Sequence, residues 1–426
     1  MPTNLRQFVR RPYGVPDDIL PKKFELGACV YGHPLASKQW DILANKDLSE
    51  FGFKKLYSSP SVMVMKQSPT NDRIAIARAT DDMLFQAPFN SPMKNKIHTF
   101  LESKYGKVTI EDPVINYLGM QFVRDRKNRT ISVFQPKFLE QMRIKYPLQP
   151  TEEYPTTPMH YSKYLSVQDK LDKEIPLTKD QITELQGVIG DSLWIAMHTK
   201  PIVKFALNVI SRKVSPNPTI YDFKQALRII HYCIGTAHVP RIIGGLHGPI
   251  LTATVDSSFA SHDDFTGQSS YTIHMGGGGA IIMDSKKQTE IPSSSTASEI
   301  VGNFLFDKAN RWSRNFLEEF GYDQNILQPD GTPTGEDNTS TMKILNNESN
   351  IGKTKFINLK FNIIKESLAN KLMKMFYLET ENMPADIGTK ALPPGTFQHL
   401  SDYVMGQKEL PHFKTFFSTR VDLPTS

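Results

Sequence analysis

Four acidic residues in the last third of the chain are the clearest candidates for chemistry: Asp256, Glu299, Asp337 and Asp386. Carboxylates are hard oxygen ligands, and several of them gathered at one point can hold a pair of divalent cations for phosphodiester chemistry. An aspartate just before a helix more often caps that helix, which is the commoner role for any one of them alone. The four residues therefore predict a metal site if folding brings them together, and helix caps if it does not.

Two more aspartates lie in a predicted hairpin in the first quarter of the chain. Ile74 and Ile76 alternate with Arg73 and two alanines, the chain then reaches Asp81 and Asp82, and an apolar stretch follows at 83–85. This pattern predicts a strand, a tight turn that carries both aspartates, and a second strand. Two interpretations stay open for the pair, namely residual metal binding and an exposed turn without a ligand.

Composition sets outer limits on these interpretations. With 39% hydrophobic and 22% charged residues over 426 positions, the chain is globular and long enough for two or three domains. A net charge of +6 suits a polyanionic partner but is a weak indicator alone. Two cysteines, Cys29 and Cys233, exclude a disulfide framework and a cysteine-based zinc site. No signal peptide and no membrane-spanning run is recognisable, so we expect a soluble intracellular protein.

Short segments along the chain resemble, in the same order, the reverse transcriptase and ribonuclease H region of the Pol polyproteins of copia-type (Pseudoviridae) LTR retrotransposons. In the first half, VYGHPLASKQW from Val30 resembles the family's LYGLKQSPRLW, ATDDML from Ala79 its YVDDML, YLGMQF from Tyr117 its FLGMxI, and LQGVIGDSLWIAMHTKP from Leu185 its YRSLIGSLLYLANxTRP. In the second half, ALRIIHYCIGTA resembles VLRYLKGT, TVDSSF resembles SDADW, SSSTASEI resembles SSTEAEY, EDNTSTMKILNN resembles CDNQSAIxLANN, and PADIGTKALP resembles LADIxTKPLP. Each string is weak alone, but their shared order and spacing identify the family.

The resemblance implies an α/β (α+β) fold in two parts. A reverse transcriptase truncated at its N-terminus, with palm, thumb and connection elements, would be followed by a ribonuclease H-like mixed five-stranded sheet with flanking helices. The predicted domain limits are 1–147 for the truncated reverse transcriptase, 148–242 for a helical connection, 243–397 for the ribonuclease H-like domain and 398–426 for a C-terminal tail.

The same resemblance implies a catalytic metal site for two Mg²⁺ ions. Asp256 would lie on the first strand and bridge both ions, and Glu299 would project from a long helix that is capped by the serines at 293–296. Asp337 would stand at the start of the next helix and Asp386 near the C-terminal one. The implied reaction is endonucleolytic cleavage of the RNA strand in RNA–DNA hybrids. The implied partner is such a hybrid or another nucleic acid, without a membrane, in the cytoplasm (virus-like particle), the nucleus, or both.

At two places in the ribonuclease H region the sequence departs from the family pattern. Residues 328–335, QPDGTPTG, are poor strand material where the family has an apolar strand, so we expect Asp337 to be displaced or mobile. The family's KHID reads KFIN, with Phe356 and Asn358 in place of a histidine and an acid.

The polymerase motifs depart further from the family. Ala79 replaces the tyrosine of YVDD, and Pro34 and Leu35 replace a lysine and a glutamine. Only six residues precede Gln7, which opens the QFVRRPYGV segment that resembles VYMRQPxGF, too few for the strand with the third polymerase aspartate. We therefore expect no DNA synthesis from this chain alone.

Two further alternatives stay open beside an active nuclease. One is a catalytically inactive retroelement relic that at most binds nucleic acid through its basic surface. The other is a subunit that works only beside an intact retroelement polymerase.

Overall fold

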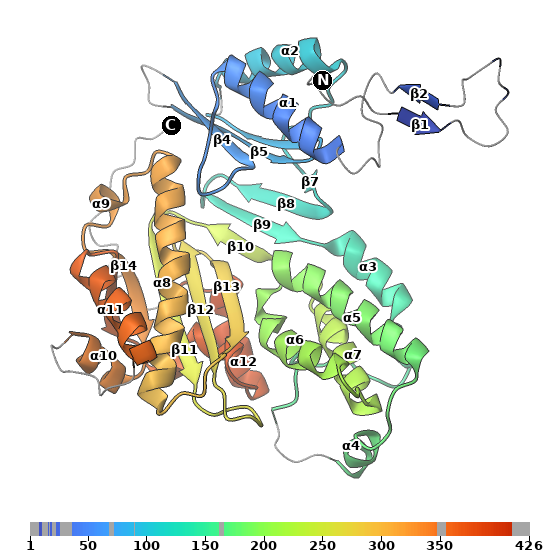
Figure 1. Cartoon of the computed structure of the whole chain (residues 1–426), viewed down its shortest axis with the longest axis vertical. Coiled ribbons are helices and arrows are strands. Elements are labelled where there is room, and N and C mark those ends of the chain that lie inside the picture. Colours follow the sequence, from blue (N-terminus) through green and yellow to red (C-terminus); the bar gives the residue numbers. More distant parts are fainter. Residues whose placement is uncertain are drawn as a thin grey trace. The chain divides into compact units, whose positions relative to one another are not determined.

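The computed structural model describes residues 8–10, 16, 18, 23–25, 36–67, 72–88, 90–161, 166–346 and 355–410. These residues group into two compact units, one that runs to Ile110 and includes Glu319–Gly321, and one that comprises Glu111–Glu318 and the residues from Tyr322 onward. Helices and sheets alternate along the chain, which confirms the predicted α/β class (Figure 1). The domain limits at 147, 242 and 397 stay predictions.

The first unit contains an antiparallel sheet of order β3-β4-β5-β6 and two helices that cover one of its faces (Figure 1). Leu48 of the first helix and Ile97 of the second pack against Met63, Ile74 and Ile76, which share that face because side chains alternate along a strand. A separate antiparallel pair, β1-β2, precedes them. The bounds are β1 (Phe8–Arg10), β2 (Lys23–Glu25), α1 (Ala36–Phe51), β3 (Lys54–Lys55), β4 (Val62–Gln67), β5 (Asp72–Ala79), β6 (Asp82–Gln86) and α2 (Met93–Tyr105).

The second unit begins with a small antiparallel sheet, β10-β9-β8-β7, and a helical core. Thr178 and Thr219 each close a capping box that starts one of the long helices, and Val188, Ile210 and Ile229 pack between them. The bounds are β7 (Asn116–Tyr117), β8 (Met120–Asp125), β9 (Thr130–Phe134), α3 (Pro136–Lys145), α4 (Val167–Asp172), α5 (Lys179–His198), η1 (Pro201–Val203), α6 (Lys204–Ser211), η2 (Arg212–Val214), α7 (Ile220–Gly235) and β10 (Arg241–Gly244).

A five-stranded sheet of order β13-β12-β11-β14-β15 forms the rest of the second unit. The first strand, β11, is antiparallel to β12 and parallel to β14, and β14 is parallel to β15, which confirms the predicted mixed sheet with flanking helices. The strand bounds are β11 (Leu251–Ser258), β12 (Gln268–Met275), β13 (Ala280–Lys287), β14 (Thr332–Glu336) and β15 (Met373–Tyr377).

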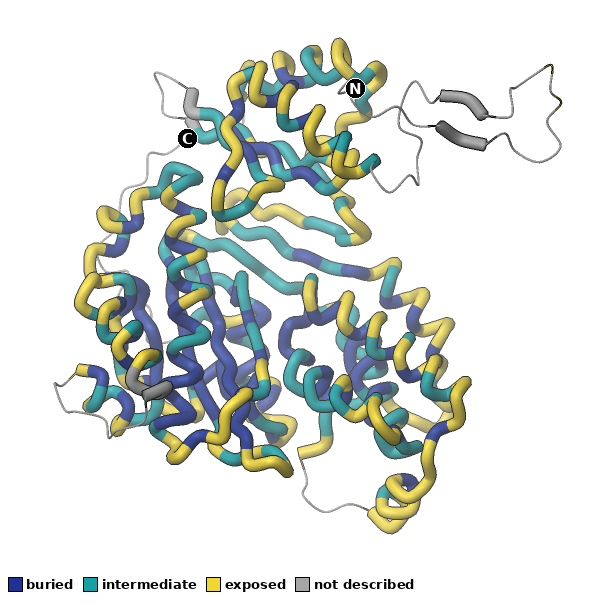
Figure 2. Tube along the Cα trace, viewed as in Figure 1, coloured by how far each residue is buried: buried dark blue, intermediate teal, exposed yellow. Residues whose placement is uncertain are grey.

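Both faces of this sheet are buried (Figure 2). Leu251, Ala253 and Val255 pack on one side against Phe306 and Ile364 of two helices, and the helical core together with the last helix covers the other side. None of the helices in the described part of the chain is long and apolar enough to cross a bilayer. The bounds are α8 (Ser295–Glu319), α9 (Gln324–Leu327), α10 (Thr339–Asn346), α11 (Lys355–Ala369), η3 (Thr380–Asn382), η4 (Pro384–Gly388) and α12 (Pro394–Val404).

Residues 328–335 are a correction to the sequence-based prediction, because part of this segment is the strand β14. The strand is buried along its whole length between β11 and β15. Pro333 has no N–H to donate, but pairing with β11 begins only one residue later, where Thr334 lies opposite Ala253. On the other side, Thr332 donates its N–H to the Leu372 carbonyl next to β15 at 3.1 Å, so the nitrogen of Pro333 faces β11, where no pairing is lost. The prediction that this segment is poor strand material is therefore wrong.

A buried glutamine completes the sheet where β14 does not reach. Gln328 donates its Nε2–H to the carbonyl of Leu251 at 2.7 Å and accepts the N–H of the same residue at 3.0 Å. One side chain thus satisfies the backbone groups that a longer strand would have paired. Contacts of this kind come from segments distant in sequence, so a local strand propensity does not report them.

Candidate metal centre

The structure brings three of the four predicted acids together at one end of β11. Asp256 lies in β11, Asp337 directly follows β14, and Asp386 lies in the short helix η4. Each offers a carboxylate oxygen, and these three oxygens lie within 4.8 Å of one another. Oxygens at this separation can share a cation, because a divalent ion with ligands at about 2.0–2.6 Å fits among them.

The fourth predicted acid belongs to a second group that shares one member with the first. Glu299, in the first turns of α8, offers an oxygen within 4.8 Å of oxygens from Glu336 and Asp337. Asp337 therefore lies in both groups, while the bridging role expected of Asp256 stays a prediction. Two overlapping groups with one common carboxylate can hold two neighbouring cations.

Glu336 is a member that the sequence reasoning missed. It is the last residue of β14, directly before Asp337, and its side chain is fully buried. The sequence signal was present, because EDN stands in this chain where the family motif has CDN. An acid at a motif position that normally carries cysteine was the clue, and only the burial of the strand end shows that it points inward.

Close backbone packing positions two of the acid-bearing elements. A Cβ atom on Gly302 of α8 would lie 2.2 Å from Oγ of Ser257 in β11, and one on Gly388 of η4 would lie 2.6 Å from Cβ of Ser270 in β12. At Gly388 only glycine avoids the collision with the Ser270 Cβ, whereas at Gly302 an added methyl would require the Ser257 hydroxyl to turn away. The helix that carries Glu299 and the turn that carries the last acid are therefore held tightly against the sheet.

Hydrogen bonds from two amide side chains hold the start of α8. Buried Gln288 donates from Nε2 to the Ser298 carbonyl at 3.0 Å and to Ser298 Oγ at 2.9 Å. Asn303 donates from Nδ2 to the Glu299 carbonyl at 3.0 Å and to Glu336 Oε2 at 2.8 Å. These contacts orient the first turns of the helix relative to the end of β14.

Helix capping does not explain the acids, although it was the alternative reading of the sequence. In α10 the cap is Asn338, whose Oδ1 accepts the Thr341 N–H at 3.0 Å. The neighbouring Asp337 instead accepts the Thr380 hydroxyl at 2.7 Å. The start of α8 is capped by Ser294, which accepts the N–H of Ala297 at 3.1 Å, as the serine run predicts. The carboxylate of Asp337 is thus left free of a capping role.

Four of the five carboxylates of the site are buried, Asp337 is half-buried, and the site is incompletely hydrogen-bonded. Relative exposure is 5% for Asp256, 4% for Glu299, 0% for Glu336 and 2% for Asp386. Oε2 of Glu299 and Oδ1 of Asp386 are buried and accept no hydrogen bond from the part of the chain that the structure describes. Buried polar atoms are nearly always satisfied in proteins, so two orphaned carboxylate oxygens in one cluster point to a missing partner.

Electrostatics at the site disfavour the ionised acids when no cation is present. Burial first, and then the neighbouring carboxylates, raise the pKa of Glu299 well above its ordinary value. Burial raises the pKa of Glu336 to about 8, despite two hydrogen bonds to its oxygens. Burial and the charge of Asp256 raise the pKa of Asp386 to about 8. Burial also raises the pKa of Asp337. A divalent cation would reverse this balance, because it stabilises the charged forms.

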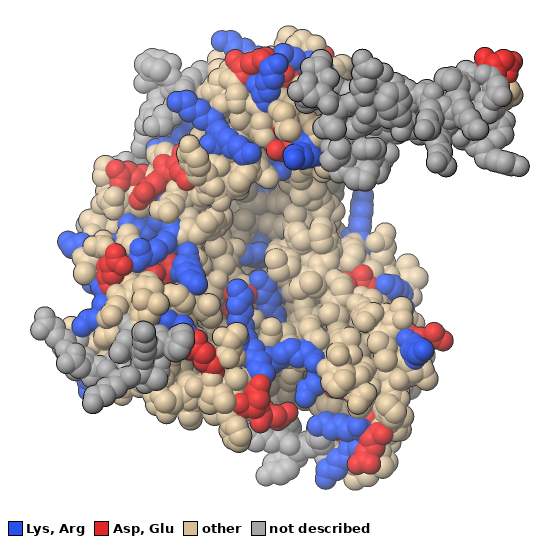
Figure 3. Space-filling view, in the orientation of Figure 1, with Lys and Arg blue, Asp and Glu red and all other residues tan. Residues whose placement is uncertain are grey.

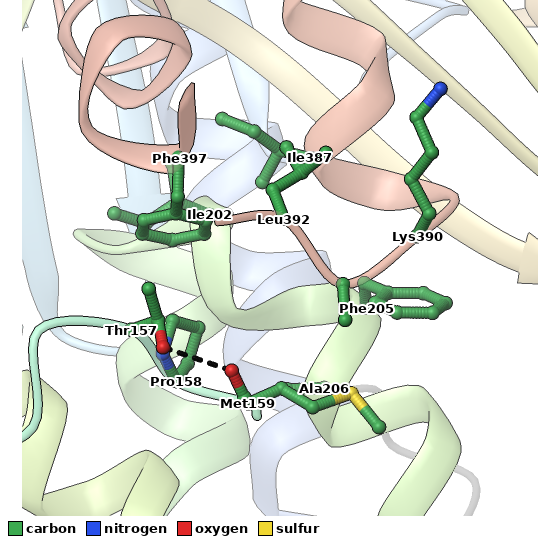
Figure 4. A pocket seen from close by; sticks show the side chains of 11 residues that line it. Thr157, Pro158, Met159, Ile202, Phe205, Ala206, Ile387, Lys390, Leu392 and Phe397 are labelled. Carbon is green, nitrogen blue, oxygen red and sulfur yellow. Dashed lines mark hydrogen bonds between the residues drawn. The ribbon is translucent and has the colours of Figure 1, made fainter. Parts of the chain in front are cut away.

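One lysine provides a positive charge beside the acids. Nζ of Lys390 lies 2.8 Å from Oδ2 of Asp386. Burial lowers the pKa of Lys390, but the charges of Asp256 and Asp386 outweigh it, and the pKa is raised. Lys390 also borders a small pocket lined by apolar side chains such as Phe205, with its ammonium turned away from them (Figure 4). The lining contains no acid, so this pocket is not the candidate site.

Basic side chains accompany the neighbouring elements α6, η2 and β13. Both α6 and β13 pack against η4, and Lys and Arg gather over them in Figure 3. Three of these cations have acidic partners, because Lys213, Lys286 and Lys287 pair with aspartates. Lys204 and Arg212 form no ion pair within the described ranges. The positive surface next to the acids is therefore small.

Asp81 and Asp82 have a very different setting in the first unit. Asp81 lies in the turn between β5 and β6, Asp82 begins β6, and Thr80 adopts a left-handed φ of 58°. Both aspartates are exposed. Among the described residues, neither belongs to a group of acids or histidines that could hold an ion. The predicted strand–turn–strand is confirmed, except that the turn carries only Asp81, because Asp82 already pairs with Ala79. Residual metal binding by the two aspartates stays untested.

Some predictions fall beyond what the structure describes. Three stretches named above lie outside the described residues: the segment from Gln7, Cys29, and the stretch that includes Pro34 and Leu35. In the first of these, the backbone of residues 8–10 is the exception. The KFIN segment begins α11. Cys233 is a buried free thiol in α7.

No family model matches the chain. It is 24% identical over 382 residues to the retrovirus-related Pol polyprotein from transposon TNT 1-94 of Nicotiana tabacum. The predicted resemblance to a copia-type retrotransposon Pol polyprotein is confirmed. The match covers 89% of the chain and 28% of the tobacco polyprotein, so the chain spans about a quarter of the length of this Pol relative.

The chain also has distant similarity to solved structures. The foamy viral protease–reverse transcriptase in complex with an RNA/DNA hybrid is 12% identical, with a TM-score of 0.44 over 87% of this chain and 41% of that one. The same viral protein in complex with dsDNA is 11% identical, with a TM-score of 0.42 over 84% of this chain and 61% of that one. Ribonuclease H1 from the archaeon Halobacterium salinarum NRC-1 is 13% identical, with a TM-score of 0.25 over 33% of this chain and 93% of that one.

Proposed function

We propose that this chain is a retrotransposon-derived reverse transcriptase/ribonuclease H protein whose remaining activity is endonucleolytic cleavage of RNA in RNA–DNA hybrids. The single observation that supports it best is the convergence of acids from four separate elements, β11, α8, the end of β14 and η4, into two overlapping groups. Resemblance to a Pol polyprotein adds the expectation of a nucleic-acid substrate. Carboxylates with two orphaned buried oxygens fit divalent cations such as Mg²⁺.

In this proposal Asp256, Glu299, Asp337 and Asp386 hold two divalent cations. When bound, such a pair activates a water and stabilises the leaving oxygen of a phosphodiester. The residues of the chain contribute position and charge. Asp337 belongs to both groups of oxygens, so its carboxylate keeps the two ligand sets in fixed relation. Lys390 offsets part of the negative charge that would otherwise repel a phosphate backbone.

The basic side chains beside the site would contact the nucleic-acid backbone. Lys204 lies on α6, which packs against η4, the element of Asp386, and Arg212 lies on η2, which packs against α6. Lysine and arginine are the usual partners of phosphate oxygens, and such contacts fix register without reading sequence. A hybrid held there would place its sugar–phosphate backbone near the acids.

We propose further that DNA synthesis is lost. A nucleotidyl transferase needs several carboxylates that converge on two cations. Asp81 and Asp82 stand alone in an exposed turn within the described part of the chain, and Ala79 replaces the tyrosine of the family motif. The front part of the chain would then serve to bind the substrate at most.

A labelled RNA–DNA hybrid tests the proposal. In Mg²⁺ the wild-type protein should cut the RNA strand, and Asp256→Asn should reduce cleavage to background. Duplex RNA and duplex DNA of the same sequence serve as substrate controls. If wild type and Asp256→Asn give the same background, the nuclease proposal fails, and a nucleic-acid-binding relic becomes the better description.

A further inference from the structure

We propose that Glu336 is a fifth carboxylate ligand of the metal centre. This inference rests on the proposed function of the same site and extends its ligand set. Its carboxylate offers an oxygen within 4.8 Å of oxygens from Glu299 and Asp337, a separation that a shared cation can bridge. The side chain stands at the end of β14, one residue before the aspartate that belongs to both groups of acids.

Glu336 has no positively charged partner among the described residues. Its Oε2 accepts from Asn303 at 2.8 Å and its Oε1 accepts from the Asn338 N–H at 3.1 Å, and both donors are neutral. Neither Glu336 nor Glu299 forms an ion pair with any described residue. Two buried carboxylates side by side without a cation are strongly unfavourable, because desolvation and mutual repulsion act together.

An independent observation points to a ligand between these two acids. Oε2 of Glu299 is buried and receives no hydrogen bond from the described chain, although Glu299 is only 4% exposed. The side chain lies in the same group of oxygens as Glu336. A cation at this point would bind the orphaned oxygen and relieve the repulsion.

The charges of the complete site balance when Glu336 is counted. The two groups together contain five carboxylates, Asp256, Glu299, Glu336, Asp337 and Asp386. Ionised, they would be neutralised by two divalent cations and the ammonium of Lys390, which contacts Asp386. A higher count of charged ligands raises the affinity for hard cations.

This ligand distinguishes the chain from the family pattern. The motif CDN places a cysteine where this chain has Glu336 in EDN. A thiolate is a softer ligand than a carboxylate and is a poor partner for Mg²⁺ or Mn²⁺. We therefore expect this chain to bind these ions more tightly than a variant that carries the family residue.

Calorimetric titration of the full chain with Mn²⁺ alone tests the inference. Wild type, Glu336→Gln and Glu336→Cys are compared, with Glu366→Gln, at an exposed position of α11, as the matched loss of one charge. We expect Glu336→Gln and Glu336→Cys to weaken the affinity at least about tenfold, as loss of a supporting or ligating group typically does. Glu366→Gln should bind as wild type does.

Folding of the variants is checked by thermal unfolding in EDTA. Glu336→Gln should fold, because its new amide can donate to Oδ1 of Asn303 once the Asn303 amide turns over. That oxygen accepts no hydrogen bond from the described residues in the wild-type chain. A folded Glu336→Gln or Glu336→Cys variant with wild-type Mn²⁺ affinity would overturn the inference.

Hybrid cleavage is measured separately, so the two proposals can fail independently. Weaker Mn²⁺ binding by the Glu336 variants supports the inference even if no cleavage is seen, in which case only the proposed function fails. Unchanged binding by these variants beside a cleaving wild type overturns the inference alone. Absence of Mn²⁺ binding by wild type overturns both.

Discussion

The hairpin that carries Asp81 and Asp82 and the cluster around Asp337 use the same kind of side chain in opposite ways. In the hairpin, the two acids are neighbours at one turn and the start of the strand after it, and both are exposed. In the cluster, acids from β11, α8, β14 and η4 meet below the surface. A carboxylate in water keeps its hydration and gains little from an ion, whereas a buried one needs a charge partner. The two regions show that convergence and burial, more than motif letters, define a metal site.

The packing that positions the acids also differs, because it is local in the hairpin and long-range in the cluster. The hairpin needs only its own turn to bring Asp81 next to Asp82. The cluster depends on Gly388, on the buried strand β14 and on hydrogen bonds from Asn303 to Glu336. Long-range contacts of this kind hold side chains in place, but they also make the cluster sensitive to small changes in packing.

The largest expected effect is the loss of hybrid cleavage in Asp337→Asn. Each bound metal stabilises the transition state by several kcal/mol, so removal of the shared ligand should lower the rate by about 10²- to 10³-fold. The double variant Asp81→Asn/Asp82→Asn is the matched control and should cleave at the wild-type rate. Single-turnover cleavage of a labelled hybrid in Mg²⁺ measures both.

The opposite result for these two variants would contradict the comparison of the hairpin with the cluster. A double hairpin variant that loses cleavage while Asp337→Asn retains it would show that the exposed turn, and not the buried cluster, carries the chemistry.

A smaller effect is expected from Gly388→Ala, which tests whether close packing maintains the cluster. The added methyl would lie 2.6 Å from Cβ of Ser270, so η4 must shift and move Asp386. Overpacking of this kind costs about 1–3 kcal/mol of stability and should weaken Mn²⁺ binding as well. Gly190→Ala in α5 is the control, since a Cβ there meets no atom within 4 Å. It should be neutral or stabilising by up to about 1 kcal/mol. Urea unfolding and Mn²⁺ titration measure the two effects, and equal behaviour of both variants would refute the packing argument.

The smallest effect is a pH dependence of the metal-free protein. The folded protein holds protons on Glu336 and Asp386, whose pKa values are near 8, above the ordinary values that apply in the unfolded chain. The native state therefore binds more protons than the unfolded state, and the free energy of unfolding must fall as the pH rises toward 8. The decline is read between about pH 7.5 and 8.5, where few histidines hold a proton in either state, because their unperturbed pKa is about 6.5. Below this window four histidines oppose the decline, because burial lowers the pKa of His160, His231, His262 and His274 in the folded protein. Urea unfolding in EDTA should show this decline, and saturating Mn²⁺ should remove it. A flat or rising profile in EDTA would contradict the raised pKa values.

Local patterns in the sequence predicted the elements that depend on local patterns. The hairpin at Asp81 and Asp82 follows from alternation and a turn, and the start of the long helix α8 follows from its serine cap. The family resemblance supplied the four acids and the mixed sheet. Neither source required knowledge of how distant segments pack.

The features that were missed depend on tertiary contacts. The strand β14 contains Pro333 and a glycine. It is stable because β11 and β15 enclose it and because Gln328 bonds to the backbone of Leu251 where β14 does not reach. Glu336 could be recognised as an unusual acid in the motif, but its full burial depends on that same strand. Local propensity carries no information about such partners.

Anomalous diffraction from crystals of the protein grown with Mn²⁺ and a non-cleavable RNA–DNA hybrid tests the central claim most directly. The account predicts two Mn²⁺ peaks about 3.5–4 Å apart. Both should contact Asp337, and one should lie between Glu299 and Glu336. Peaks absent from these carboxylates, or present only at Asp81 and Asp82, would contradict it.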